Sequence, residues 1–153
     1  MKNRAPLLVS AAIIYRKVQN AGSNGKAKSS GEILVGQRRR SDRHSLKWEF
    51  PGGKVEIGET PQQALARELQ EELTIGAKIG CELARYEHDY SSGSRIHLLF
   101  FVVTEFEGNP EARVFEQIRW TPLEWLPQLD FLEGDIDFVR RLARGEFARQ
   151  LAR

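Results

Sequence analysis

The segment from Thr60 to Leu73 constrains the fold most, because it combines a helix start signal with a long apolar stripe. Its first residues, Thr60-Pro61-Gln62-Gln63, supply an N-cap threonine, a proline at the first helical position and a glutamine at the third. This is the arrangement of a capping box. Leu65, Leu69 and Leu73 follow at four-residue spacing and therefore share one face. The segment predicts a helix that buries this face against a core.

Three carboxylates lie beside that apolar stripe on the predicted helix: Glu68, Glu71 and Glu72. Like charges one turn apart destabilise a helix by about 0.2–0.5 kcal/mol per pair, and Arg67 is the only base between Glu59 and Ala77. Clustered carboxylate oxygens suit hard divalent cations such as Mg²⁺ or Mn²⁺. Just upstream, Phe50-Pro51-Gly52-Gly53-Lys54 is a tight loop whose glycines permit close backbone approach. The pattern predicts a metal and phosphate site, with a charged helix face beside an ordinary turn as the alternative.

The charge of the chain is divided unevenly along its length. Residues 1–48 hold eleven Lys and Arg against two acidic residues, whereas residues 49–153 hold twelve against nineteen. This division suits a site in which carboxylates bind cations while nearby arginines meet an anionic substrate. Solvated charge on loops is the alternative that the composition leaves open.

The single cysteine, Cys81, limits the classes of protein that the chain can be. It cannot form an internal disulfide, so neither a disulfide-rich secreted scaffold nor a cysteine-rich zinc site is expected. Any metal must be held by oxygen or histidine. No apolar run approaches the ~18 residues that a membrane span needs. We therefore expect a cytoplasmic protein without a membrane partner, folded as one domain over residues 1–153.

Two short apolar runs near the N-terminus predict buried strands. They cover Leu7–Tyr15 and Glu32–Gln37. The intervening stretch, Val18–Gly31, is rich in Gly, Ser, Asn and Lys and predicts a flexible hairpin loop.

The remaining elements follow in the second half of the chain. Lys78–Tyr90 and Arg95–Phe106 flank Ser91–Ser94 and predict a long β-hairpin with a four-residue turn. A further strand is expected over Arg113–Trp120, and a last helix over Gly134–Ala148. Strands around a central helix, closed by another helix, predict an α/β fold with a mixed sheet between helices.

The residues around the predicted metal site resemble the Nudix box, Gly-x5-Glu-x7-Arg-Glu-U-x-Glu-Glu-x-Gly-U, in which U is apolar. Gly53, Glu59 and the run from Arg67 to Glu72 stand at the required spacings. One position departs from the pattern, because Thr74 occupies the place of the last glycine. Thr74 must either accept the left-handed conformation, at a cost of ~1 kcal/mol, or shift the helix end toward Gly76.

The flanks of the box are similar to the MutT branch of the Nudix family. The resemblance rests on Val35–Arg39 and Trp48–Lys54 before and within the box, and on Phe106–Gly108 and Ile118–Trp120 after it. It implies a Nudix α/β/α sandwich that hydrolyses a nucleoside triphosphate to the monophosphate and pyrophosphate. The branch acts on oxidised nucleotides such as 8-oxo-dGTP, in the service of DNA repair, and includes a group that prefers CTP.

The resemblance also implies roles for residues of the box. Glu68, Glu71 and Glu72 would bind catalytic Mg²⁺, or Mn²⁺, together with the carbonyl oxygen of Gly52. Arg67 would pair with Glu59 to hold the loop against the helix, a plain surface ion pair being the alternative.

Outside the box, the resemblance implies residues that bind the nucleotide or act on it. Arg38 or Arg39 would meet the phosphates or the base. Asp135 would read the base edge, with a helix N-cap as its competing role. Glu49 and Phe50 would line the nucleoside pocket, although Phe50 equally fits a core position. Glu116 would act as general base, because it is the carboxylate nearest to the position where the branch carries one.

Different functions stay open from the sequence alone. An RNA 5′-pyrophosphohydrolase would use the basic N-terminal third to track a phosphate backbone. A nucleoside diphosphate sugar hydrolase and a catalytically silent, nucleotide-sensing module also fit the same motifs. We expect a nucleotide substrate and no stable nucleic-acid partner. The sequence determines neither the preferred base nor the oligomeric state.

Overall fold

The computed structural model describes residues 6–21, 27–90 and 93–152. Within these ranges, seven strands form one mixed sheet. They are β1 (Leu7–Ala21), β2 (Ala27–Gln37), β3 (Trp48–Glu49), β4 (Gly52–Lys54), β6 (Glu82–Asp89), β7 (Arg95–Val103) and β9 (Gln117–Pro122). A small second sheet pairs β5 (Gly76–Lys78) with β8 (Glu105–Glu107). The helices are α1 (Pro61–Leu73), α2 (Ile136–Ala143) and α3 (Ala148–Leu151), with 3-10 turns η1 (Leu123–Gln128) and η2 (Glu133–Asp135).

Strand β1 organises the sheet because it pairs along both of its edges. It runs parallel to β7, with Leu7 opposite Ile96, and antiparallel to β4 and β2. Successive side chains of a strand point to opposite faces. Ile13 therefore enters one core cluster and Ile14 the other. The apolar run predicted as a strand is buried from both sides.

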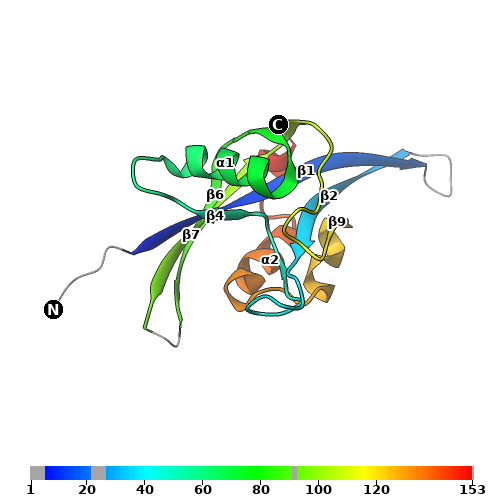
Figure 1. Ribbon diagram of the computed structural model, residues 1–153. Helices are drawn as coiled ribbons and strands as arrows, with labels where there is room; N and C mark the ends of the chain where they lie inside the picture. Colours follow the sequence, from blue (N-terminus) through cyan, green and yellow to red (C-terminus); the bar gives the residue numbers. More distant parts are fainter. Residues whose placement is uncertain (1–5, 22–26, 91–92, 153) are drawn as a thin grey trace.

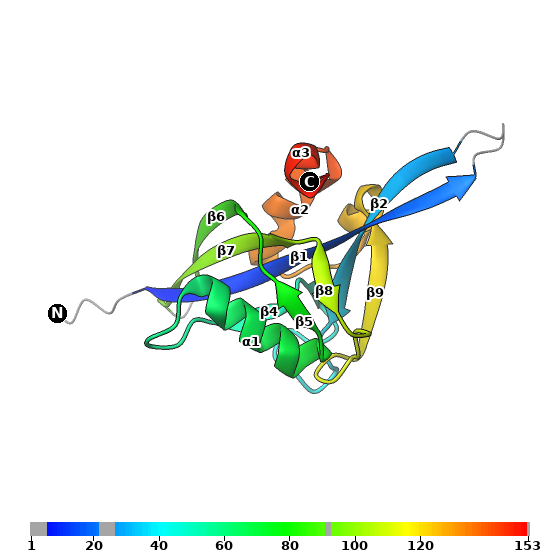
Figure 2. The same cartoon turned by 90° about the horizontal axis from the view of Figure 1, so that it is seen from above.

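Helices cover both faces of this sheet, as Figures 1 and 2 show. On one face, α1 buries the predicted stripe of Leu65, Leu69 and Leu73 completely. On the other face, α2 packs through Phe138, Val139 and Leu142. The predicted α/β class, with a mixed sheet between helices, is confirmed. No helix within the described ranges is long and apolar enough to cross a membrane.

Both ends of α1 follow from local sequence. The Thr60 hydroxyl accepts a hydrogen bond from the Gln63 amide at 3.1 Å, and the Gln63 side chain accepts one from the Thr60 amide at 2.9 Å, which completes the capping box. At the other end Thr74 takes the left-handed conformation, with φ 59°. Of the two predicted alternatives, the strained threonine is the one observed, and the helix does not extend toward Gly76.

The predicted loop over Val18–Gly31 is wrong in its outer parts. β1 continues to Ala21 and β2 begins at Ala27, and their ladder runs from Tyr15–Ile33 to Ala21–Ala27 as a projecting two-stranded arm (Figure 2). A ladder needs backbone groups rather than apolar side chains, so a polar composition does not prevent it. Residues 22–26, the middle of the predicted loop, lie outside the described residues.

Gly31 lies within β2 although glycine is more typical of loops. A Cβ atom at this position would lie 2.2 Å from Cε2 of Tyr15, so only glycine leaves room for the tyrosine ring. The glycine is a packing requirement of the arm and not a turn signal.

The predicted last helix is also broken. α2 ends at Ala143, Gly145 has φ 82°, and α3 begins at Ala148. Ile136, the first residue of α2, is 38% exposed. Glycine adopts the left-handed conformation without strain and therefore commonly ends a helix, as Gly145 does after α2.

Two predicted strand boundaries also differ from the structure. The strand expected from Arg113 begins at Gln117, and the long hairpin is confirmed over β6 and β7 but is interrupted before β8. Residues 91–92 of its predicted turn lie outside the described part.

The left-handed residues allow a direct test of the helix ends. Replacing Thr74 with Gly should raise the free energy of unfolding by about 1 kcal/mol, because glycine removes the left-handed penalty. The control is Gly145→Ala, at φ 82° with no atom within 4 Å of the added Cβ, which should lower it by a similar amount. Urea unfolding measures both values. A loss of stability in Thr74→Gly would show that its side-chain contacts outweigh the strain.

Candidate active site

The centre of the candidate site is the crossing of α1 over the glycine turn at β4. The amide of Gly52 donates a hydrogen bond to Oε2 of Glu72 at 3.3 Å. A Cβ on Gly52 would lie 2.0 Å from the carbonyl oxygen of Ser10, and one on Gly53 would lie 2.5 Å from Cδ of Glu68. The two glycines therefore let this turn pass between the backbone of β1 and the carboxylates of α1.

Arg67 ties the segment before α1 to the carboxylates of the helix. Its Nε and Nη2 donate to the two oxygens of Glu59, each at 2.9 Å, and Nη1 donates to Glu68 at 2.9 Å. Nη2 also reaches the carbonyl oxygen of Lys54 at 3.2 Å. The expected Glu59–Arg67 pair is present, and it is more than a single surface ion pair because one guanidinium binds two carboxylates and a carbonyl. Hydrogen bonds from Arg67 lower the pKa of Glu59.

The three box glutamates have different surroundings. The side chain of Glu68 is 17% exposed and is engaged by Arg67, whereas that of Glu71 is 60% exposed. Burial raises the pKa of Glu72 to about 8, and the neighbouring charges of Glu68 and Glu49 raise it further, against the hydrogen bond from Gly52. Negative charge is therefore poorly compensated at Glu72.

The oxygen atoms of these side chains are of the kind that binds a hard cation, although the side chains do not converge on one point. Among residues 6–21, 27–90 and 93–152, no three His, Cys, Asp or Glu side chains are close enough to hold an ion as they stand. The donors present are carboxylate and carbonyl oxygens, the ligands that Mg²⁺ and Ca²⁺ prefer. Gly53 keeps the space above Glu68 free, and a bound cation would relieve the repulsion from Glu68 and Glu49 that raises the pKa of Glu72. The donor set fits a divalent metal ion.

A second group of charged residues lies at the end of β2 and in β3. Arg38 contacts Glu49 at 3.2 Å through Nη1 and donates from Nε to the carbonyl oxygen of Arg43 at 2.6 Å. Burial raises the pKa of Glu49, while Arg38 opposes this shift. Arg39 points elsewhere, since its Nη2 donates to the carbonyl oxygen of Arg113 at 2.8 Å. Of the two predicted arginines, Arg38 is the one beside Glu49.

Asp135 is the last residue of η2 and stands directly before α2. It is 6% exposed, and its side chain makes no capping hydrogen bond although it stands at the N-cap position. Burial raises the pKa of Asp135 to about 8, with a further contribution from the charge of Glu49. Its carboxyl group is therefore mainly protonated at neutral pH, and the alternative role as a side-chain cap is wrong.

The last two predicted site residues are Phe50 and Glu116. Phe50 is a core residue, because its ring packs against Phe100, Phe131 and Phe138 at centroid distances of 5.2–6.0 Å and is almost fully buried. Of its two predicted positions the core is the one observed, and a contact with the nucleoside stays a prediction. Glu116 is exposed just before β9, and within the described part of the chain no hydrogen bond or ion pair joins it to the three box glutamates. A role for it as general base stays a prediction.

Two residues of the long hairpin, His88 and Tyr90, belong to the surroundings of Asp135 and Glu49. The sequence analysis did not predict either of them as a site residue. The pKa of Tyr90 is raised by burial and by the charges of Asp135 and Glu49, against Arg38, so its hydroxyl lies within their electrostatic reach. The ring of His88 lies 4.8 Å from that of Tyr90. The alternation of aromatic side chains along β6 is the signal that could have indicated a shared face.

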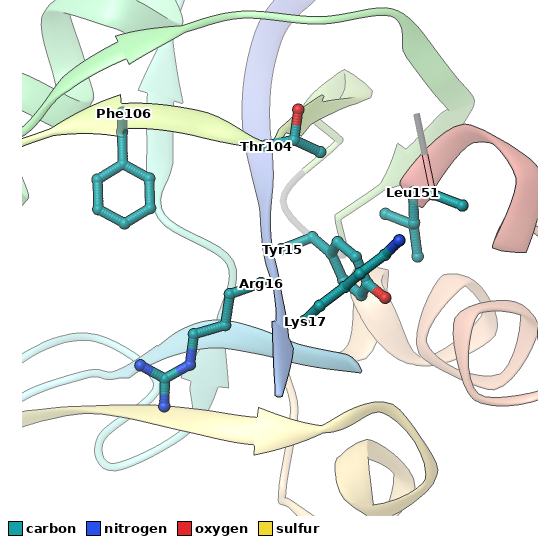
Figure 3. Close-up of a pocket in the computed structure, with 7 residues that line it drawn as sticks. Tyr15, Arg16, Lys17, Thr104, Phe106 and Leu151 are labelled. Atoms are coloured by element: carbon teal, nitrogen blue, oxygen red, sulfur yellow. The ribbon is translucent and has the colours of Figure 1, made fainter. Parts of the chain in front are cut away.

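A separate pocket of about 450 Å³ lies beside the base of the β1–β2 arm (Figure 3). Its lining residues are Tyr15, Arg16, Lys17, Thr104, Phe106, Leu151 and Ala152. None of the predicted site residues belongs to this lining.

The comparison with known families agrees with the carboxylate helix and its glycine turn. The NUDIX domain model matches residues 23–142, most of the chain. The sandwich fold and the box residues on α1 thus define a member of the NUDIX domain family, and the chain belongs to it.

Within that family, the similar proteins are MutT-like. The chain is 37% identical to the 8-oxo-dGTP diphosphatase of Escherichia coli (strain K12), over 75% of this chain and 88% of that protein. It is 39% identical to the CTP pyrophosphohydrolase of the same organism, over 71% of this chain and 80% of that protein. The solution structure of the E. coli ORF135 protein superposes with a TM-score of 0.75 and 34% identity, covering 94% of this chain and 92% of that one. The expected branch of the family is confirmed.

The buried carboxyl group of Asp135 predicts a pH dependence of stability. Its pKa is raised on folding, so between about pH 4 and 8 the folded chain keeps a proton that the unfolded chain loses, and stability falls as pH rises. Asp135→Asn lacks this titration. Its stability relative to the natural chain should therefore increase by up to about 1.4 kcal/mol per pH unit from pH 5 to 8.

Chemical unfolding at several pH values measures this difference, without added metal. The control is Asp89→Asn, because Arg95 lowers the pKa of the exposed Asp89 and its removal should bring no gain at any pH. A difference between Asp135→Asn and the natural chain that stays constant over pH 5–8 would contradict the protonated state of Asp135.

Proposed function

We propose that this NUDIX hydrolase cleaves a nucleoside triphosphate to the monophosphate and pyrophosphate, with 8-oxo-dGTP as leading substrate and CTP or a methylated pyrimidine triphosphate next. The observation that carries the proposal is the arrangement of two differently charged regions. Glu68 and Glu72 of the box lie against the glycine turn at β4, and a buried, protonated carboxyl group, Asp135, lies within electrostatic reach of Glu49. The names of the similar proteins support the same class of reaction.

We assign the metal to Mg²⁺, held by Glu68, Glu71 and Glu72 with the carbonyl oxygen of Gly52. When bound, the ion lowers the pKa of a coordinated water and neutralises charge on the polyphosphate. Arg67 orients Glu68 through a hydrogen bond of 2.9 Å. Gly53 keeps the carboxylate of Glu68 accessible from the turn, because any larger residue would fill that space.

We assign base recognition to Asp135, with Arg38 and Glu49 beside it. A protonated carboxyl group donates a hydrogen bond, so it suits an acceptor such as O6 of guanine, whereas an ionised one only accepts and suits the amino group of cytosine. The raised pKa of Asp135 favours the first state at neutral pH. This is the physical reason for placing an oxidised guanine nucleotide ahead of CTP.

A substrate panel tests this function. Purified protein with Mg²⁺ is assayed on 8-oxo-dGTP, dGTP, CTP, a nucleoside diphosphate sugar and 5′-triphosphate RNA, with kcat/KM and the released product recorded. We expect the highest kcat/KM with a nucleoside triphosphate and pyrophosphate as product. A higher value with the sugar or the RNA, or binding without turnover of any nucleotide, would contradict the proposal.

Replacing Asp135 tests whether this residue recognises the nucleobase. Asp135→Asn keeps the shape of the side chain but offers a donor and an acceptor at every pH. The ratio of kcat/KM between 8-oxo-dGTP and CTP should change about tenfold, equivalent to the ~1–3 kcal/mol of a good base contact. The inhibition constant of inorganic tripolyphosphate, which has no base, should stay within twofold. An equal loss on both nucleotides would contradict base recognition by Asp135.

A further inference from the structure

Strand β6 holds the start of α2 through polar and packing contacts on one face. The hydroxyl of Tyr86 donates a hydrogen bond to Oδ2 of Asp137 at 2.7 Å and accepts one from Nη1 of Arg141 at 2.7 Å. Two residues further along β6, the ring of His88 lies against Gly134, where an added Cβ would be 3.5 Å from its Cγ. The strand therefore contacts the helix and the turn before it at two successive positions.

One partner of the Tyr86 hydroxyl, Arg141, is itself held by further contacts. Arg141 donates from Nε to Glu146 at 2.6 Å, and its guanidinium lies over the ring of Phe147 at 5.0 Å. A tyrosine hydroxyl has one hydrogen to donate, and here Asp137 receives it. The hydroxyl thus links one carboxylate and one guanidinium of α2 to β6 in a defined geometry.

Asp135 depends on this link because its own side chain has no anchor. Within the described residues, no hydrogen bond or ion pair holds its carboxyl group. Its position is set by the backbone of the first turn of α2, two residues before Asp137. A base-reading group must be held within about 0.5 Å of its productive position, so the contacts that hold this turn control what Asp135 can do.

We propose that Tyr86 is a positioning residue for base recognition: its hydroxyl, bonded to Asp137 and Arg141, fixes the first turn of α2 against β6 and so sets the position of Asp135. The inference rests on the proposed function, which assigns base reading to Asp135. It adds a residue on the long hairpin, far from the box, to those that determine specificity.

The obvious alternative is that Tyr86 only stabilises the core. Its ring packs edge-on against Phe100 and Phe138, with centroids 5.9 and 6.2 Å away. Tyr86→Phe keeps this packing and removes only the hydroxyl, so it separates the two roles. Asp137→Asn is the conservative partner variant, because its amide oxygen still accepts the hydrogen bond from Tyr86. Asp137→Ala removes the acceptor.

The experiment measures the ratio of kcat/KM between 8-oxo-dGTP and CTP, the inhibition constant of tripolyphosphate, and the melting temperature. Tyr86→Phe and Asp137→Ala should each lower the ratio three- to tenfold and leave the tripolyphosphate constant within twofold. Asp137→Asn should keep the ratio within twofold, and the double variant Tyr86→Phe/Asp137→Ala should lose no more than either single variant. Leu151→Val, in the same core cluster but on α3, serves as a control that lowers stability without changing a residue of β6 or α2.

The outcomes separate this inference from the proposed function. An unchanged ratio in Tyr86→Phe, with a changed ratio in Asp135→Asn, would overturn the inference and leave the proposed function intact. A loss that is equal on both nucleotides and matches that of Leu151→Val would also overturn it, because the role would then be structural only. An Asp135→Asn variant with an unaltered ratio would overturn the assignment of base recognition to Asp135 and this inference with it, whereas the substrate panel still decides the proposed hydrolysis.

Discussion

The close approach of α1 to the glycine turn at β4 is the contact on which the rest of the site depends. It brings the amide of Gly52 to Glu72 and leaves the carboxylate of Glu68 in the space that a side chain at position 53 would enter. The capping box fixes where α1 begins, and its leucine stripe fixes how the helix is rotated on the sheet. Arg67 then joins the preceding segment to the carboxylates. Backbone geometry and hydrogen bonding thus gather charges that repel one another.

That repulsion gives the site its chemistry. Glu72 and Asp135 have raised pKa values because both are buried, and the charge of Glu49 acts on both. Arg38 compensates only Glu49 through a direct contact. Both carboxyl groups therefore keep a proton near neutral pH, and at Glu72, beside the turn, a bound cation would take the place of that proton. A single fold supplies an acidic cation site and a hydrogen-bond donor for a base.

The sequence predicted the parts of this arrangement that depend on neighbours in the chain. The capping box and the leucine stripe are local signals, and the helix end at Thr74 is one of the two alternatives that the sequence left open. Distant segments decide the rest: the predicted loop was wrong at Gly31 because this residue pairs with Lys17 of β1, and the core alternative holds for Phe50 because three other rings pack against it. The bond between Tyr86 and Asp137 joins residues 51 positions apart, and no local pattern indicates it.

The central claim is that the uncompensated carboxylates at the glycine turn form a cation site. Its most direct test is the melting temperature of the natural chain and of Glu72→Gln with increasing Mg²⁺ at constant ionic strength, beside Glu105→Gln on the exposed β8 as control. Binding to the folded state alone raises the melting temperature. The account predicts a rise at millimolar Mg²⁺ in the natural chain and in Glu105→Gln, and at most a third of that rise in Glu72→Gln. A melting temperature indifferent to Mg²⁺, or an equal rise in Glu72→Gln, would contradict it.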